Sequence, residues 1–246
     1  MVQYEKFYQL HHQQSPFLLA NAWNVKSAQL IEEAGFEAIG TSSGAISSSL
    51  GYEDGEKIPF SELLYIIRRI KACTKISLSV DLERGYSDDL NVLTDNIQML
   101  IDCGVSGINI EDAQGEDLFL RKLESIRNYL IRANQKLFIN ARTDGFLQKL
   151  PSPLETTIKR AQLYQNAGAD GLFVTAVSDT AVIKEITSST SLPVNIAGTA
   201  KLTVDTLAGV GVKRISMAVL LYKATYNQLE KITRNVKTEN SFSALF

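Results

Sequence analysis

Acidic side chains follow three apolar segments in the middle of the chain. Asp81 and Glu83 come after SLSV, Glu111 follows GINI, and Arg142 and Asp144 come after FINA. Within each pair the spacing of two places both side chains on one side of an extended strand. Oxygen ligands favour a hard cation, and Mg²⁺ takes few protein carboxylates and leaves positions for substrate oxygens. We therefore predict a Mg²⁺ site, able to take Mn²⁺ instead, on Asp81, Glu83 and Glu111, with Arg142 beside it to share a substrate's negative charge.

Other cations and purely structural roles fit these residues less well. Calcium needs more ligands, and zinc needs His or Cys, whereas the only histidines, His11 and His12, stand in a polar N-terminal leader. The two cysteines predict neither a disulfide framework nor a zinc site. A single carboxylate at a strand end can equally cap a helix or pair with an arginine. The agreement of three carboxylates and one arginine favours a functional site.

These residues are positioned by a recurring local pattern. A helical segment ends in a small residue or cysteine plus glycine, and an apolar strand follows within three residues, at 32–41, 101–112, 165–176 and 207–217. Glycine closes a helix in the left-handed conformation, and the chain then turns into a buried strand. Buried strands alternating with helices are typical of parallel sheets covered by helices.

Eight such units are expected along the chain. The strands are predicted at 17–20, 38–41, 76–81, 107–111, 137–142, 171–175, 193–197 and 214–217, and the helices at 24–34, 60–72, 89–103, 117–134, 153–167, 179–188, 203–209 and 218–236. A doubly wound sheet has fewer strands and a glycine-rich first turn, which ANAWN at 20–24 lacks. We predict an α/β fold, one (β/α)₈ TIM barrel over residues 1–246, with the active site at the carboxyl ends of its strands.

Charge and hydrophobicity argue against nucleic-acid binding, membrane insertion and secretion. A net charge of −2 gives no electrostatic footprint for nucleic acid or an anionic membrane. No apolar run reaches the roughly 18 residues of a membrane helix. The polar first residues lack the apolar stretch of a signal peptide, so we expect a cytoplasmic location.

Several motifs, in order along the chain, resemble the isocitrate lyase/phosphoenolpyruvate mutase superfamily. They are AGFEAIGTSSGAISSSLGYED (34–54), VDLERGY (80–86), IED (110–112), NARTD (140–144) and RAQLYQNAGAD (160–170). The glutamate in DLE is similar to that of the phosphonomutase-like branch. The resemblance implies a (β/α)₈ barrel whose last helix swaps between subunits of a homodimer or homotetramer.

The resemblance also implies roles for single residues. Asp54 matches an aspartate that completes the outer shell of the metal. Ser42, Ser43 and Gly44 match positions that bind the substrate carboxylate through hydroxyl and N–H groups. Arg142 matches the arginine that contacts oxygens of the substrate and the intermediate.

Three further residues are candidates for the site. Tyr86 lies at the top face, where its hydroxyl is a candidate catalytic contact. Asn195, at the end of the seventh strand, resembles a position that faces the pocket. Trp23 follows the first strand and is a candidate for binding substrate, with packing in the core as the alternative.

One departure from the family concerns the loop after the fourth strand. Lyases carry a KKCGH-type motif there, whose cysteine donates a proton, and the mutases carry a longer gating loop. Here only AQGED (113–117) precedes the next helix. Decarboxylation tolerates an open site, because water can protonate the enolate, whereas closed sites protect reactive intermediates.

The predicted activity is that of a Mg²⁺-dependent lyase or mutase. It would cleave or rearrange a C–C or P–C bond of a small 2-oxo or 2-hydroxy acid through a metal-held enolate, like an oxaloacetate decarboxylase or a phosphonomutase. The main alternative is a catalytically weak or inactive barrel that binds a carboxylate metabolite or a protein partner. A third reading is a phosphate-binding barrel that uses the loop 195–200.

Overall fold

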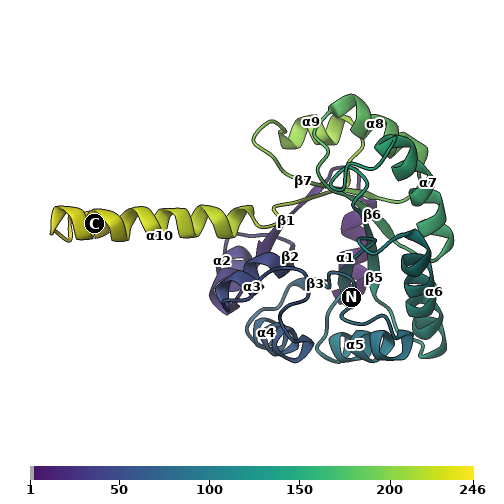
Figure 1. Cartoon of the computed structure of the whole chain (residues 1–246), viewed down its shortest axis with the longest axis horizontal. Coiled ribbons are helices and arrows are strands. Elements are labelled where there is room, and N and C mark those ends of the chain that lie inside the picture. The colour runs from purple at the N-terminus through teal and green to yellow at the C-terminus, as the bar shows by residue number, and fades with distance from the viewer. Residues whose placement is uncertain (1–2) are drawn as a thin grey trace.

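Eight parallel strands pair in sequence order and close on themselves, because the first strand pairs with the second on one side and with the eighth on the other. The computed structural model describes residues 3–246 (Figure 1). Its strands are β1 (Phe17–Ala22), β2 (Ala38–Thr41), β3 (Ser77–Asp81), β4 (Gly107–Glu111), β5 (Phe138–Thr143), β6 (Gly171–Val174), β7 (Val194–Ala197) and β8 (Arg214–Ser216). The predicted (β/α)₈ barrel is confirmed, and each predicted strand overlaps an observed one.

The eight predicted helices are also present. They are α2 (Val25–Glu33), α4 (Phe60–Cys73), α5 (Leu90–Asp102), α6 (Glu116–Arg132), α7 (Pro153–Asn166), α8 (Thr180–Ser189), α9 (Val204–Gly209) and α10 (Leu220–Glu239). Their apolar positions recur at helical spacing, as Leu63, Ile67 and Ile70 do on α4, and this face is buried against the barrel. Full burial of each such side chain contributes about 1.5–3 kcal/mol.

Three short elements were not predicted: α1 (Gln3–His12), α3 (Ser43–Ser49) and the 3₁₀ helix η1 (Ser243–Leu245). The α3 sequence, SGAISSS, is short and rich in serine, so it carries no apolar period that would indicate a helix. It follows β2 directly, and its first turn lies at the mouth of the barrel.

The N-terminal helix α1 covers the end of the barrel opposite the mouth. The prediction that His11 stands in a polar leader is wrong, because its side chain is 1% exposed. Its ring stacks on Phe138 at 3.9 Å, and Phe7 contacts it edge-on. A Cβ at Gly107 would lie 2.6 Å from the Phe7 ring, so glycine at this position lets α1 approach β4.

The last helix, α10, extends away from the barrel (Figure 1). None of its residues is buried within the described chain. Even Tyr226 and Leu229, which belong to its apolar stripe, are 39% and 50% exposed. The helical spacing of this stripe predicts a core face, packed on its own barrel or on a partner's. Val219 and Tyr222 pack against the core of their own barrel, whereas Leu220, Tyr226 and Leu229 stay exposed. Across residues 3–246, no helix combines the length and apolar character required to cross a membrane.

His11 should make the fold sensitive to acid. Burial lowers the pKa of His11 well below its usual value, and its Nδ1–H donates to the Phe7 carbonyl. The unfolded chain therefore binds a proton below about pH 6.5 that the folded chain does not, and stability falls as pH drops through that value. We predict that His11→Phe removes up to about 2 kcal/mol of the stability lost between pH 7 and 5. Urea unfolding at both pH values measures this, and an unchanged loss would contradict it.

Candidate active site

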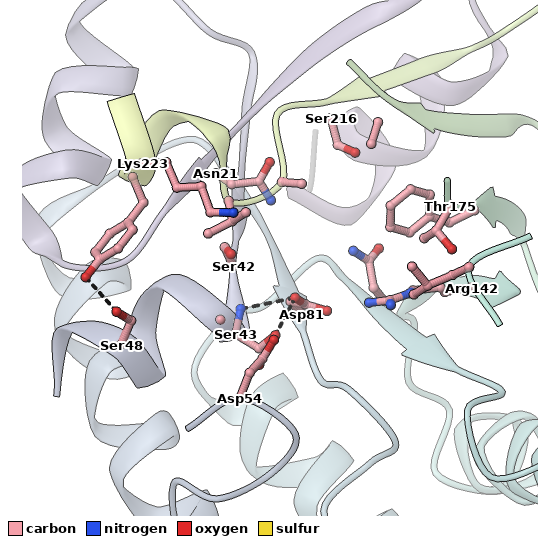
Figure 2. Close-up of a pocket in the computed structure, with 18 of the residues that line it drawn as sticks. Asn21, Ser42, Ser43, Ser48, Asp54, Asp81, Arg142, Thr175, Ser216 and Lys223 are labelled. Carbon is pink, nitrogen blue, oxygen red and sulfur yellow. Dashed lines mark hydrogen bonds between the residues drawn. The ribbon is translucent and has the colours of Figure 1, made fainter. Parts of the chain in front are cut away.

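A cavity of about 560 Å³ opens at the carboxyl ends of the strands (Figure 2). Its wall combines carboxylates, hydroxyls and cations from different elements. The lining includes Ser42, Ser43, Asp54, Asp81, Arg142 and Thr175. Because this is the end of a barrel where the loops meet, side chains distant in sequence come together there.

Asp81, the last residue of β3, is oriented by the start of α3. Its Oδ2 accepts a hydrogen bond of 2.8 Å from the Ser43 hydroxyl and one of 3.1 Å from the Ser43 N–H (Figure 2). Ser42 caps the same helix, since its hydroxyl accepts from the Ala45 N–H. The β2–α3 turn therefore fixes one oxygen of Asp81, and Ser43, predicted to bind substrate, directs its donors at this carboxylate.

Gly44 brings Asp54 against the first turn of α3. A Cβ at Gly44 would lie 3.0 Å from Oδ2 of Asp54, a contact tight enough to force the carboxylate to move. Both residues line the cavity beside Asp81. Absence of a side chain at position 44 thus sets where the Asp54 carboxylate lies.

Glu83 lies behind the mouth and is 3% exposed. Its backbone turns to a φ of 49°, and its side chain accepts from the Glu56 N–H at 2.7 Å and from the Tyr86 hydroxyl at 3.2 Å. Burial, followed by the charges of Asp81 and Asp54, raises the pKa of Glu83 to about 7. Tyr86 thus directs its hydroxyl to Glu83.

Arg142 on β5 is held by two carboxylates. Its Nε and Nη2 donate to the two oxygens of Asp144 at 2.8 and 3.0 Å, and its Nη1 lies 2.8 Å from Glu111. Burial raises the pKa of Glu111 to about 8; Arg142 opposes this rise, and Asp81 adds to it. One guanidinium thus stands among several carboxylates that repel one another.

Asp112 supports this arrangement from a fully buried position. It accepts from Arg160 at 2.7 Å, from the Tyr164 hydroxyl at 2.5 Å and from the Asp144 N–H at 2.9 Å. Thr175, on the far side, donates to Asp144 at 2.8 Å. The second acidic residue of IED therefore orders the β5–α7 turn that carries Asp144.

The carboxylates converge without forming a closed cage. Within residues 3–246, no three His, Cys, Asp or Glu side chains come close enough to hold a metal ion alone. Burial raises the pKa values of Glu83 and Glu111; the charge of Asp81 adds to both rises, and Arg142 opposes the rise at Glu111. A cation would relieve the repulsion among these carboxylates, and Mg²⁺, which keeps several waters, fits such an incomplete set of oxygen ligands.

Five of the predicted residues do not line the cavity: two of the three predicted metal ligands, Glu83 and Glu111, together with Tyr86, Asn195 and Trp23. Asn195 is 1% exposed inside the barrel, as the register partner of Arg214. Trp23 lines a separate apolar groove, between α2 and α10, and its ring meets Tyr222 edge-on at 5.2 Å.

Sequence reasoning missed Asn109, Phe173, Tyr222 and Lys223 in the cavity wall. Asn109 carried a signal, because it stands two residues before Glu111 and therefore on the same side of β4. Tyr222 and Lys223 carried none, since only the path of α10 places them there; the Tyr222 hydroxyl lies 2.9 Å from that of Ser48 (Figure 2).

The mouth is open above β4. This strand ends at Glu111 and α6 begins at Glu116, so four residues connect them. The short connection expected from the sequence is confirmed.

Fold and site together define a (β/α)₈ barrel with an acidic, arginine-containing pocket at its carboxyl end. The chain belongs to the phosphoenolpyruvate phosphomutase family, whose sequence model matches residues 7–237. An uncharacterized Mycobacterium tuberculosis protein is 37% identical over 219 residues, which are 89% of this chain and 83% of that one. An oxaloacetate decarboxylase of Rhodopseudomonas palustris is 32% identical over 73% of this chain and 65% of its own length. The crystal structure of a candidate phosphonomutase from Burkholderia cenocepacia superposes with a TM-score of 0.90, at 32% identity, over 95% of this chain and all of that one.

Gly44 offers a test of the metal surroundings. We predict that Gly44→Ala weakens Mg²⁺ binding on the order of tenfold, because the new methyl group displaces Asp54, the residue expected in the outer shell of the metal. Calorimetric titration with Mg²⁺ measures this. Gly209→Ala is the control, since its Cβ would meet nothing within 4 Å. Equal affinities in all three proteins would contradict the prediction.

Proposed function

We propose that this protein is a Mg²⁺-dependent lyase that cleaves a C–C bond of a small 2-oxo acid, with decarboxylation of oxaloacetate as the reference reaction. The observation that carries the proposal is the Arg142 guanidinium, clamped by Asp144 and Glu111 in one cavity wall with Asp81. The similarity to an oxaloacetate decarboxylase supports the same reaction class.

The residues at the mouth suit a hydrated divalent cation. Asp81 would hold Mg²⁺, or Mn²⁺, directly, Glu83 and Glu111 directly or through water, and Asp54 from the outer shell. When bound, the metal supplies a Lewis acid that accepts the negative charge developing on the 2-oxo group as the bond breaks.

The chain's own residues bind and orient the substrate. Ser42 and Gly44, at the start of α3, would contact its carboxylate, whereas Ser43, whose N–H and hydroxyl both donate to Asp81, would orient the Asp81 carboxylate. Arg142 would donate to the oxygen on which charge develops; because Asp144 already fixes the guanidinium, little reorganisation is needed during the reaction. Tyr86, through its bond to Glu83, would hold that carboxylate in place.

The open mouth favours decarboxylation within this chemistry. The four residues between β4 and α6 supply no cysteine as a proton donor. Water reaching the cavity can protonate the carbanionic product of decarboxylation. Rearrangement of a P–C bond is the second candidate, supported by the likeness to the Burkholderia candidate phosphonomutase.

Turnover measurements test the proposal. Oxaloacetate, phosphonopyruvate and alkylated malates are incubated with the protein, with Mg²⁺ or with a chelator. We expect metal-dependent release of CO₂ from oxaloacetate, abolished in Asp81→Ala and lowered about 10²–10³-fold in Arg142→Ala. Full activity in both variants would refute the assignment of the site. A protein that turns over no member of the panel would instead be a binding barrel without catalysis.

We also infer that α10 packs against a second copy of the chain, so that the protein forms a homodimer or a homotetramer. Its exposed stripe and the groove lined by Trp23, Leu30 and Phe36 form adjoining apolar surfaces. Such surfaces on soluble proteins mark association sites.

Light scattering after size exclusion tests this association. We expect an oligomer for the parent chain and a shift to monomer for Leu229→Asp, because a charge would then be buried in the interface. Asn227→Asp, on the opposite side of α10, adds the same charge and should keep the oligomer. A monomeric parent chain would disprove the inference.

A further inference from the structure

Arg214 crosses the interior of the barrel below the cavity. It starts at the beginning of β8 and is 1% exposed, yet its Nη2 reaches Oδ1 of Asn109 on β4, on the opposite side of the barrel, at 3.0 Å. Its Nε and Nη1 find no hydrogen-bond partner within residues 3–246. A buried guanidinium without a carboxylate bonded to it is costly, so its place in the interior calls for an explanation.

The bond to Arg214 determines how the Asn109 amide is oriented. An amide side chain can be turned over without changing its shape, and its orientation follows from its partners. A guanidinium can only donate, so the atom of Asn109 that faces it must be the oxygen. The same oxygen accepts from Nδ2 of Asn140 at 2.9 Å. Two donors therefore occupy Oδ1 of Asn109 and leave its NH₂ group on the other side.

The NH₂ group of Asn109 is available to the cavity. Asn109 lines the cavity wall together with Asp81 and Arg142, and it is the register partner of Asp81. Within the described chain, no acceptor for this NH₂ group is found among the side-chain hydrogen bonds of Asn109. A hydrogen-bond donor thus stands at the floor of the cavity, two residues along β4 below Glu111, which is the register partner of Arg142.

The positive charge of Arg214 also favours an anionic ligand in the cavity. Burial lowers the pKa of Arg214 to about 9, and Asp81 opposes this, so the guanidinium is still protonated at neutral pH. A positive charge below the floor favours an anion above it, and in a low-dielectric interior such a charge is weakly screened. The donor of Asn109 and the charge of Arg214 therefore select the same kind of ligand atom.

We propose that Asn109 binds an anionic oxygen of the substrate from the floor of the cavity, and that Arg214 is the positioning residue that fixes the Asn109 amide for this contact. The substrate class rests on the function proposed above. The contact would add a third donor side chain to those of Arg142 and the first turn of α3.

The test compares variants by calorimetric binding of oxalate in the presence of Mg²⁺. Asn109→Asp keeps an oxygen towards Arg214 and Asn140 and replaces only the NH₂ group. We expect its oxalate affinity to fall about 100-fold or more while its melting temperature is kept. A titration with Mg²⁺ alone reports any cation that the new carboxylate attracts.

Arg214 is tested by two substitutions and one control. Arg214→Met should lower oxalate affinity on the order of tenfold without lowering the melting temperature, because it removes an unpaired buried charge. Arg214→Lys should restore part of the affinity, since it can still donate to Asn109. Arg127→Met is the control: this arginine pairs with Asp170 at the far end of the barrel, and its loss should lower stability and leave affinity unchanged.

The outcomes separate this inference from the proposed function. Oxalate binding by the parent chain with affinities within twofold in Asn109→Asp and Arg214→Met would overturn the inference and leave the proposed function intact. An equal loss in Arg127→Met would also overturn it, by showing a general effect of stability. Failure of the parent chain to bind oxalate with Mg²⁺ would overturn the proposed function, and the inference with it.

Discussion

Negative charge crowded at one end of the barrel is the constraint on which the site depends. Parallel strands end together, so Asp81, Glu111 and Asp144 are brought to one mouth by the topology itself. Burial raises the pKa values of Glu83 and Glu111, and the charges of neighbouring carboxylates add to this rise. Arg142 offsets part of the repulsion among these carboxylates, and a divalent cation would offset the remainder.

Buried residues behind the mouth hold these charged side chains in place. Asp112 and Arg160 form a buried ion pair behind β5, and Asp112 also accepts from the backbone of Asp144. Breaking such a pair costs several kcal/mol, so the support is rigid. Side chains whose own partners are fixed need little reorganisation when a ligand arrives, which is the physical basis of an electrostatic site.

Much of the fold and part of the site could be predicted from the sequence. Helix-ending glycines followed by apolar strands indicated the eight units, because this alternation is a local property of the chain. The spacing of Asp81, Glu111 and Arg142 located the mouth for the same reason. Contacts between distant segments left no such signal: the burial of His11 depends on α1 packing across β4 and β5, and the place of Lys223 depends on the path of α10.

For some residues the sequence predicts the right region of the barrel but not the contacts that the side chain makes. Tyr86 lies at the top of the barrel, as expected, but its hydroxyl donates to Glu83. Asn109 lies in a segment that the sequence predicts to be an apolar strand, although its polar side chain lies in the cavity wall. In both cases the backbone position followed from the sequence, whereas the direction of the side chain depended on neighbours from other strands.

We propose that Asp81 and its neighbours form a site where a divalent cation and a planar dianion bind together. The most direct measurement is the affinity for Mg²⁺ with and without oxalate, in the parent chain and in Asp81→Ala. Because coupling between two ligands is reciprocal, oxalate must tighten Mg²⁺ binding by the same factor as Mg²⁺ tightens oxalate binding. We predict such coupling in the parent chain and its loss in Asp81→Ala. Equal Mg²⁺ affinity with and without oxalate in the parent chain would contradict it.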